Sequence, residues 1–303
     1  MARYSRPSGP LGSSLSWSQV AMVEPSYKFA CGRKWGYSRI LQLREPPGIR
    51  LIAGRAYDEG INALLGARMA ALSASEALNT AWKVAAVSFD QGIEGFREPL
   101  EKAQADSYAV MVEAAIACFH RELPGLVPAA LQSDHSYTVR TADGGSVSVR
   151  GRSDYIEPDG TIVENKLSGL ARWNREGEWD EAWVAEHRDQ LVLYWLARRA
   201  EERRGIAQPA PVVPRARFDV IHAHVGLKEP KLRSLVLEFD VEDERRALAA
   251  VRNANAIIRD GRLSARPGPA CDWCGFRDRC RADEVARGAS FSDLVGLRKE
   301  VVA

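Results

Sequence analysis

The sequence lacks several features that would restrict its function at once. No apolar run reaches the ~18 residues that a membrane-spanning helix needs. Residues 1–18 contain no apolar core of the kind found in secretory signals. We therefore expect a cytoplasmic protein that does not bind membranes. The phosphate-binding pattern Gly-x-x-x-x-Gly-Lys-Ser/Thr is also absent, which excludes a P-loop motor within this chain.

An excess of either charge is missing too. The chain has 42 Lys and Arg against 40 Asp and Glu, for a net charge of +2. A strongly basic domain would have indicated nucleic-acid binding by electrostatics alone. Basic residues cluster at 28–39 and 262–279, but solvated surface charge explains both clusters equally well. The hydrophobic fraction of 46% is enough for a packed core, so the chain is not a disordered protein.

Cysteine is scarce, with five in 303 residues. Cys271, Cys274 and Cys280 lie together near the C-terminus, and Cys31 lies near the N-terminus. In a cytoplasmic chain such thiols are more often metal ligands than disulfides. The Cys-x-x-Cys spacing suits two thiolates on one ion, so the four thiols indicate a structural metal site. Cys118 lies in an alanine-rich helical stretch and is expected to be a buried core thiol.

Patterns of hydrophobicity predict a mixed α/β protein. Helical patterns come first, then strands separated by turn residues, then helices again. Ser16 or Ser18 can cap the first helix, and Pro124 ends the last helix before the strands. The helical stretches are 51–74, 100–123, 181–204 and 241–259. The strands are 135–140 and 146–150 around a turn at 143–145, 155–156 and 161–163 around a turn at 158–160, and 217–221 and 235–239.

The second of these hairpins carries a charged set that consists of Asp154, Glu164 and Lys166. If 158–160 forms a three-residue loop, Asp154 lies directly opposite Glu164, with Cβ atoms roughly 5 Å apart. Glu164 and Lys166 are two residues apart, so they share a face of their strand. Two carboxylates this close repel each other unless a cation lies between them.

The charged set suits metal-assisted hydrolysis of phosphodiesters. Mg²⁺ prefers hard oxygen ligands, and it lowers the pKa of a water that then attacks the phosphate. Lys166 would orient that water or stabilise charge on the phosphate, and the carbonyl of Asn165 would add an oxygen ligand. A surface salt bridge is the alternative. Against it, Ile162 and Val163 make both faces of the strand apolar, which indicates a central strand.

Three motifs resemble, in order, those of the PD-(D/E)XK nuclease superfamily, and in particular its RecB-like and CRISPR-associated exonucleases. They are Gly151-Arg152-Ser153-Asp154, Glu164-Asn165-Lys166 and the pair Gln190 and Tyr194, which share a helix face. Leu15-Ser16-Trp17-Ser18 and Cys31-Gly32-Arg33-Lys34-Trp35 resemble the opening elements of the same family. The resemblance implies a restriction-endonuclease-like core, in which helices flank a central mixed sheet.

The domain layout follows from this resemblance and from the order of the elements. A flexible tail at 1–14 would precede a helical region at 15–128 and the nuclease core at 129–240. A C-terminal helix and the cysteine segment would occupy 241–303. Residues 15–303 would together form one compact unit.

The resemblance also assigns roles to single residues. A divalent ion, Mg²⁺ or Mn²⁺, would be held by Asp154, Glu164, Asn165 and Asp58. Asp58 lies in a motif, Gly54 to Glu59, that normally supplies a histidine ligand. Either Asp58 binds the metal there as a hard oxygen ligand, which favours Mg²⁺ over softer ions, or that ligand is missing. The residues with catalytic roles would be Asp154, Glu164, Lys166, Gln190 and Tyr194.

The expected function is that of a metal-dependent deoxyribonuclease, an exonuclease on single-stranded DNA or DNA ends in recombination, repair or CRISPR-type processing. Cys31, Cys271, Cys274 and Cys280 would hold a [4Fe–4S] cluster, with structural zinc as the alternative. A helicase or recombination protein would be a partner. Two other functions stay open: a catalytically weak DNA-binding or scaffold subunit of a helicase–nuclease or recombination complex, and a nuclease acting on RNA. The tryptophans at 173, 179 and 183 would stack on unpaired bases or pack a loop against the core.

Overall fold

The protein is described by a computed structural model that defines residues 14–44, 47–94, 102–206 and 213–286. All but the last residue of the tail expected at 1–14 lies outside these ranges. The chain divides into two compact units. The first consists of Met1–Pro46, Thr138–Arg150 and Leu248–Ala303, and the second of Pro47–Tyr137 and Gly151–Ala247. The four segments expected from the sequence stay a prediction, since each unit draws on several of them.

A mixed six-stranded sheet flanked by helices confirms the predicted fold class. Its order is β1-β3-β4-β5-β6, with β2 paired to β3. β4 and β5 run parallel, whereas β3 with β4 and β5 with β6 run antiparallel. The longer strands are β2 (Ala130–Arg140), β3 (Ser146–Ile156), β4 (Ile162–Ser168), β5 (Arg215–His222) and β6 (Lys231–Glu238).

The sixth strand, β1 (Ser14–Ser16), was not predicted from the sequence. It pairs in parallel with β3, where Leu15 lies beside Val149. A strand of three residues is too short to show an alternating pattern, so its position is evident only from the pairing.

The loop between β3 and β4 has the predicted length. The Glu157 N–H donates to the Thr161 carbonyl at 2.9 Å, which closes a loop of three residues. Gly160 has φ +85°, a conformation that glycine adopts without strain, and Asp159 accepts from the Thr161 N–H at 2.9 Å. Tyr155 is paired with Val163. The backbone pairing of β3 with β4 ends there, and Asp154, the preceding residue of β3, contacts β4 through its side chain, which accepts from the Asn165 N–H.

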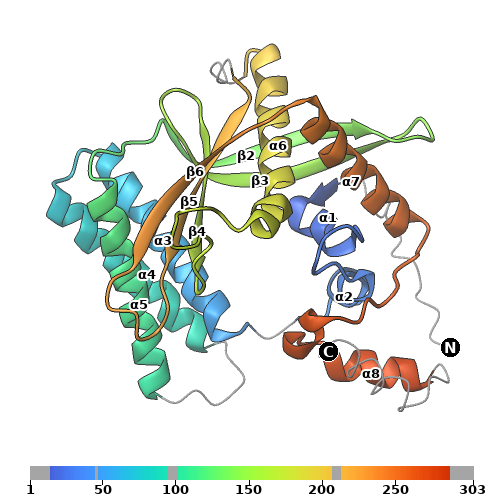
Figure 1. Ribbon diagram of the computed structural model, residues 1–303, viewed down its shortest axis with the longest axis horizontal. Helices are drawn as coiled ribbons and strands as arrows, with labels where there is room; N and C mark the ends of the chain where they lie inside the picture. The colour runs from blue at the N-terminus through green and yellow to red at the C-terminus, as the bar shows by residue number, and fades with distance from the viewer. Residues whose placement is uncertain (1–13, 45–46, 95–101, 207–212, 287–303) are drawn as a thin grey trace. The chain divides into compact units, whose positions relative to one another are not determined.

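Helices cover both faces of the sheet in the second unit. Figure 1 shows α3 (Ile49–Met69), α4 (Ala74–Glu94) and α5 (Lys102–Glu122) on one side of β4–β6, and α6 (Glu181–Arg203) on the other. Alternate residues of a strand face opposite sides. Val163 accordingly packs with α3–α5, whereas Phe218, the β5 neighbour of Glu164, contacts Trp183 of α6 with ring centroids 5.2 Å apart.

The long helix expected at 51–74 ends earlier, at Met69, and α4 begins at Ala74. Ala71 takes φ +57° in the turn between them. Neither glycine nor proline marks this turn, which is why composition did not reveal it. A capping box marks the start of α4: the Ser73 N–H donates to Glu76 Oε2 at 2.9 Å, and the Glu76 N–H donates to Ser73 Oγ.

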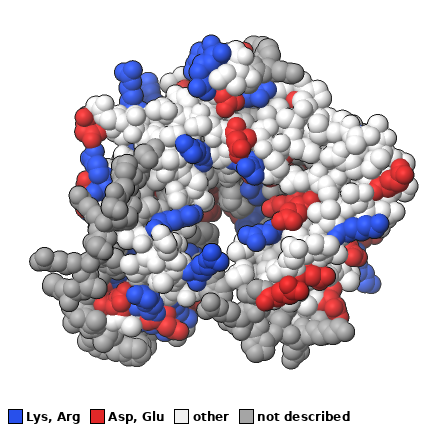
Figure 2. Space-filling model, turned by 180° about the vertical axis from the view of Figure 1, so that it is seen from behind, with Lys and Arg blue, Asp and Glu red and all other residues white. Residues whose placement is uncertain are grey.

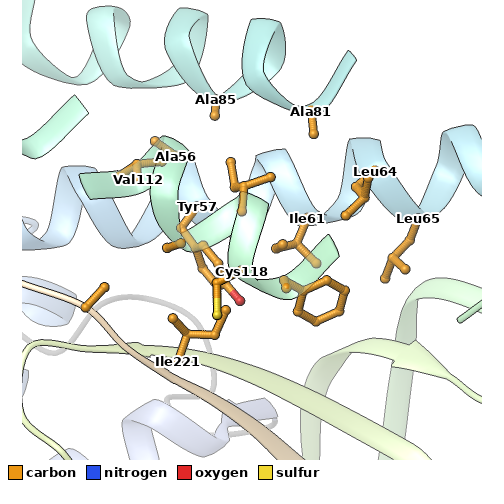
Figure 3. Packing of buried hydrophobic residues seen from close by; sticks show 14 of the residues in the cluster. Ala56, Tyr57, Ile61, Leu64, Leu65, Ala81, Ala85, Val112, Cys118 and Ile221 are labelled. Atoms are coloured by element: carbon orange, nitrogen blue, oxygen red, sulfur yellow. The ribbon is translucent and has the colours of Figure 1, made fainter. Parts of the chain in front are cut away.

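The core of the second unit lies between α3, α4, α5 and the sheet. Figure 3 shows Ala81 and Ala85 of α4 facing the larger side chains of α3, including Ile61 and Leu64. The helices approach closely at Gly60, where an added Cβ would lie 2.5 Å from Ile116 Cδ1. Cys118 is fully buried in this cluster, as predicted.

The first unit contains the two ends of the described chain. Ser16 caps α1 (Trp17–Val23) in a capping box with Gln19, as the sequence allowed. The part of α7 (Val241–Arg259) from Leu248 onward also belongs here, and this helix has the predicted bounds, with Gly261 at φ +68° just beyond it. The remaining elements are α2 (Gly32–Trp35), the π-helical turn η1 (Gly36–Ile40), the 3₁₀ turn η2 (Pro269–Trp273) and α8 (Arg277–Ala286). Within the described ranges, no helix is both long and apolar enough to cross a membrane.

Candidate active site

The charged set expected on the β3–β4 hairpin comes together in the second unit. Asp154 Oδ2 accepts a hydrogen bond of 2.6 Å from the backbone N–H of Asn165. Lys166 Nζ donates to Glu164 Oε2 at 2.8 Å. Glu164 and Lys166 share a face of β4, and Asp154 on β3 is joined to the same strand by its hydrogen bond with Asn165. A direct Asp154–Glu164 pair stays a prediction.

Glu164 is the most deeply buried acid of this set, with 3% of its surface exposed. Its Oε1 atom is buried and has no hydrogen-bond partner among the described residues. Burial raises the pKa of Glu164 to about 7, against the opposing charge of Lys166 and with a contribution from Asp154. A buried carboxylate oxygen without a partner is unfavourable, so the position favours a bound cation.

Lys166 remains protonated in this environment. Burial alone would lower its pKa, but the carboxylates of Glu164, Asp154 and Asp58 outweigh burial and raise it. The ammonium group therefore partly neutralises three acids and is available to donate hydrogen bonds.

Asp58 on α3 belongs to the same electrostatic group. Burial and, after it, the negative charge of Asp154 raise its pKa to about 8. Burial also raises the pKa of Asp154. Three carboxylates that are all difficult to ionise thus act on one another, together with Lys166. Whether Asp58 is a metal ligand stays a prediction.

The carboxylate oxygens of this site are suitable ligands for a divalent ion, but the described side chains are not arranged around one ion position. Among the residues that the structure describes, no group of three His, Cys, Asp or Glu side chains is placed to hold a metal. However, Glu164 Oε1 has no partner there, and burial above all raises the pKa values of Asp58, Asp154 and Glu164, so their ionised forms lack the compensation that water would give. A hard cation would supply that compensation.

Asn165 points its side chain away from the acids, because it alternates with Glu164 and Lys166 along β4. It is 4% exposed, and its Oδ1 atom is buried without a hydrogen-bond partner in the described part of the chain. Its backbone N–H orients Asp154. The structure thus shows the Asn165 backbone orienting the Asp154 carboxylate. The role of the Asn165 carbonyl as a metal ligand stays a prediction.

Gln190 and Tyr194 on α6 connect to the acids directly. Gln190 Nε2 lies 3.2 Å from Glu164 Oε2 and 3.0 Å from Tyr194 Oη, and it donates to both. Tyr194 is 5% exposed, and burial together with the charge of Glu164 raises its pKa. The four-residue spacing therefore does place both side chains on the helix face that borders Glu164.

Comparison with known proteins agrees with this arrangement. Residues 28–281 match the sequence profile described as the PD-(D/E)XK nuclease superfamily. The chain belongs to the PD-(D/E)XK nuclease superfamily. No curated protein matches it.

Two solved structures are similar to this chain at low sequence identity. One is a candidate exonuclease from Eubacterium rectale, 13% identical, with a TM-score of 0.47 over 86% of this chain and 87% of that one. The other is the protein SSO0001, which is 11% identical, with a TM-score of 0.41 over 87% of this chain and 83% of that one.

The tryptophan-containing segment of the nuclease follows the site along the chain. Trp173 and Trp179 form an isolated β-bridge, and Arg233 lies 5.5 Å from both ring centroids. Trp183 is buried, and its ring stacks on His187 with centroids 4.5 Å apart. Packing therefore accounts for Trp183, whereas Trp173 and Trp179 keep part of their surface exposed.

His187 is held in the same packing. Its Nδ1 is 2.8 Å from the Trp183 carbonyl, and its ring meets Phe218 edge-on at 6.0 Å. Burial lowers its pKa to about 4, so it is neutral at pH 7. These contacts hold the partly buried histidine of α6 against β5, in keeping with a structural role.

The four cysteines that are predicted to hold a metal or cluster all belong to the first unit. Cys31 precedes α2, Cys271 and Cys274 lie at η2, and Cys280 is on α8. The buried guanidinium of Arg33 donates to Cys280 Sγ at 3.5 Å and forms an ion pair with Glu284. Burial raises the pKa of the Cys280 thiol, and the nearby Cys31 contributes to the rise. The positive charge of Arg33 beside Cys280 would stabilise thiolates that bind a metal. A metal cluster at these cysteines stays a prediction.

Several residues next to the site were not singled out from the sequence. His135 is 3% exposed and its Nε2 lies 2.8 Å from Ser153 Oγ, directly before Asp154. Gly151, the first residue of the Asp154 motif, lies against Tyr194. No local pattern marks His135, because its contacts depend on β2 and α6 coming together in the fold.

Proposed function

We propose that this nuclease is a metal-dependent deoxyribonuclease whose active site is formed by Asp154, Glu164 and Lys166. The observation that supports it best is the state of Glu164. Its carboxylate is buried, has one oxygen without a partner in the described part of the chain, and lies beside two further acids and a lysine. Buried, strongly perturbed groups of this kind are typical of catalytic sites.

Asp154, Glu164, Asp58 and the carbonyl of Asn165 are the residues that would hold Mg²⁺ or Mn²⁺. When bound, the ion supplies Lewis-acid activation of water and of the scissile phosphate. The Asn165 backbone N–H fixes the orientation of Asp154. Gln190 does the same for Glu164.

Lys166 has a separate role, because it stays protonated beside the acids. Its ammonium group would stabilise the negative charge that develops on the phosphate, or orient the attacking water. The ion pair with Glu164 holds it in place before substrate arrives.

DNA with a free end or a single-stranded region is the substrate we infer, with the RecB-like exonucleases as the branch. On the face drawn in Figure 2, Lys, Arg, Asp and Glu are scattered among large neutral areas, in keeping with the near-zero net charge. Binding would therefore depend on contacts close to the site more than on a broad positive surface. A helicase or recombination protein that supplies single strands would be a natural partner.

Cleavage of two forms of single-stranded DNA tests this proposal. Linear end-labelled and closed circular DNA are incubated with Mg²⁺ or Mn²⁺ and with wild-type protein, Lys166→Ala, or the exposed control Lys83→Ala. We expect metal-dependent loss of the linear form only, abolished in Lys166→Ala and kept in Lys83→Ala. Cleavage of the circle would make the protein an endonuclease. DNA binding without any cleavage would favour the scaffold function.

We also propose that the four cysteines hold a [4Fe–4S] cluster, with zinc as the alternative occupant. Iron, sulfide and zinc are measured in anaerobically purified protein, together with its visible absorption. We expect iron and sulfide in wild type, their loss in Cys271→Ser, and their retention in Cys118→Ala, which removes the buried core thiol instead. Zinc without colour would replace the cluster by a zinc site, and no metal in wild type would reject both.

A further inference from the structure

The ring of Tyr194 is held between two residues that the proposed chemistry does not use. Gly151 of β3 lies against it on one side, and His135 of β2 stacks on it. Tyr194 in turn accepts a hydrogen bond from Gln190, whose amide also donates to Glu164. Any displacement of the ring therefore changes a contact of the buried carboxylate.

Gly151 leaves no room for a side chain. A Cβ built there would lie 2.1 Å from Cε1 of Tyr194, and 2.7 Å from both Cζ and Oη. Such distances cannot occur between real atoms, and a packed ring is not a flexible chain end that can move aside. The φ angle of Gly151 is not positive, so its backbone would suit any residue. Glycine is therefore required here for space alone.

His135 holds the ring by stacking. The two ring centroids are 5.2 Å apart with an interplanar angle of 29°. His135 is itself fixed, because its Nε2 lies 2.8 Å from Ser153 Oγ and both residues are buried. Ser153 precedes Asp154, so the same contact ties the ring to the strand that carries an acid of the site.

We propose that Gly151 and His135 are positioning residues that fix Tyr194, and through Gln190 the carboxylate of Glu164. This inference rests on the proposed function for its effect on cleavage. It assigns the glycine of the Asp154 motif a spatial role: only a residue without Cβ lets Tyr194 approach β3. It also assigns His135 a role as the aromatic support of an active-site side chain.

A double-mutant cycle of Gly151→Ala and Tyr194→Ala tests the role of Gly151. The cleavage rate and the affinity for Mn²⁺ alone are measured in all four proteins. We expect Gly151→Ala to lower the rate by about 100-fold in wild type, since misplacement by about 1 Å can have that effect. In the Tyr194→Ala background the ring is gone, and Gly151→Ala should change the rate less than about twofold. Gly169→Ala is the control, because its added Cβ meets nothing within 4 Å.

Equal losses from Gly151→Ala in both backgrounds would overturn the inference, because the effect would then not pass through the Tyr194 ring. If wild type does not cleave DNA, the proposed function fails. The Mn²⁺ affinities of the same four proteins still decide whether Gly151 positions Glu164. If the effects of Gly151→Ala and Tyr194→Ala on Mn²⁺ affinity are additive, the inference is rejected.

A second pair of variants tests His135. His135→Phe keeps a ring against Tyr194 but loses the hydrogen bond to Ser153, whereas His135→Ala loses both. Since a stacked pair contributes modestly, we expect His135→Ala to lower the rate about fivefold and His135→Phe to restore most of it. Failure of His135→Phe to restore the rate, with the same loss in Ser153→Ala, would assign the effect to the hydrogen bond and reject the stacking role.

Discussion

Two buried acids in the second unit, Glu164 and Asp219, differ in how completely the protein supplies hydrogen-bond donors to their carboxylates. At the active site, Glu164 keeps one carboxylate oxygen without a partner among the described residues, and its pKa is raised to about 7. Elsewhere on the sheet, Asp219 is completely buried but accepts hydrogen bonds from Tyr155, Ser234 and Arg217. Among the described residues Glu164 accepts only at Oε2, from Lys166 and Gln190, whereas both oxygens of Asp219 have donors.

The difference separates acids that stabilise the fold from acids that bind something. A buried carboxylate with a full set of donors holds its surroundings together, and removing it leaves those donors unpaired. A buried carboxylate with one oxygen left without a donor weakens the fold, and it is retained where a ligand completes its coordination. Partner count, more than burial, therefore distinguishes Glu164 from Asp219.

The largest expected effect is that of Glu164→Gln on cleavage. The amide keeps the shape of the side chain but removes the charge that would hold a divalent ion, so we expect the rate to fall about 1,000-fold. The free energy of unfolding should change by no more than about 1 kcal/mol, because the burial that raises the pKa of Glu164 offsets its ion pair with Lys166. Single-turnover cleavage and urea unfolding measure the two quantities.

Asp134→Asn is the matched control for Glu164→Gln. Asp134 is 76% exposed and pairs with the exposed Arg152. Neither cleavage nor stability should change. Full activity in Glu164→Gln would place Glu164 with the structural acids and contradict the division drawn here.

Asp219→Asn should show the reverse pattern. Breaking a buried ion pair on one side leaves Arg217 less compensated, and we expect a loss of about 3 kcal/mol in unfolding free energy. Urea unfolding measures this loss, and the remaining folded protein should keep its cleavage rate. Glu122→Gln, which breaks a surface pair with Arg121, should cost no more than about 0.5 kcal/mol. A large loss of cleavage in Asp219→Asn at unchanged stability would show that Asp219 serves the reaction.

The acids of the site were predictable from the sequence for a definite reason. The turn residues fix the hairpin register, which pairs Tyr155 with Val163 and brings Asp154 to the beginning of the Glu164–Lys166 segment. The four-residue spacing likewise places Gln190 and Tyr194 on one helix face. These relations are local in the chain. They depend on the regular spacing of residues along a strand or along a helix.

Other parts were beyond such reasoning because their partners lie far apart in the chain. Asp219 receives its hydrogen bonds from Tyr155 and Ser234, which are brought to it only by strand pairing. The contact of His135 with Tyr194 needs β2 to meet α6. In the first unit, Arg33 contacts Cys280 over a separation of 247 residues. No pattern of residue types signals such contacts before the fold is known.

Asp243 is another buried acid with several hydrogen-bond donors, and its contribution to stability should depend on pH. Burial works to raise its pKa, but hydrogen bonds from Arg188, the Asp240 backbone and Arg246 lower it to about 2. A carboxylate whose pKa is depressed in the folded state stabilises the protein above its unfolded pKa of about 3.9. That contribution, about 2 kcal/mol, should be complete at pH 6 and be lost as the pH falls from about 4 to 2.

The measurement compares wild type with Asp243→Asn by urea unfolding from pH 6 to pH 3. The difference in unfolding free energy should shrink as the pH falls. Glu242→Gln, whose side chain is 74% exposed, should show a small difference that does not depend on pH. A difference between wild type and Asp243→Asn that stays constant over this range would show that the charge of Asp243 is not what stabilises the fold.

The smallest expected effect concerns which metal the incompletely paired acids prefer. If Asp58 is a ligand, Asp58→His replaces a hard oxygen by imidazole, and the ratio of Mn²⁺ to Mg²⁺ affinity should rise about tenfold. Asp58→Ala should instead weaken both ions equally. Titration of each metal, with cleavage rates at saturation, measures the change, and the exposed neighbour Glu59→His provides the control. An unchanged ratio with unchanged activity in Asp58→His and Asp58→Ala would mean that the raised pKa of Asp58 reflects burial beside the site and not metal binding.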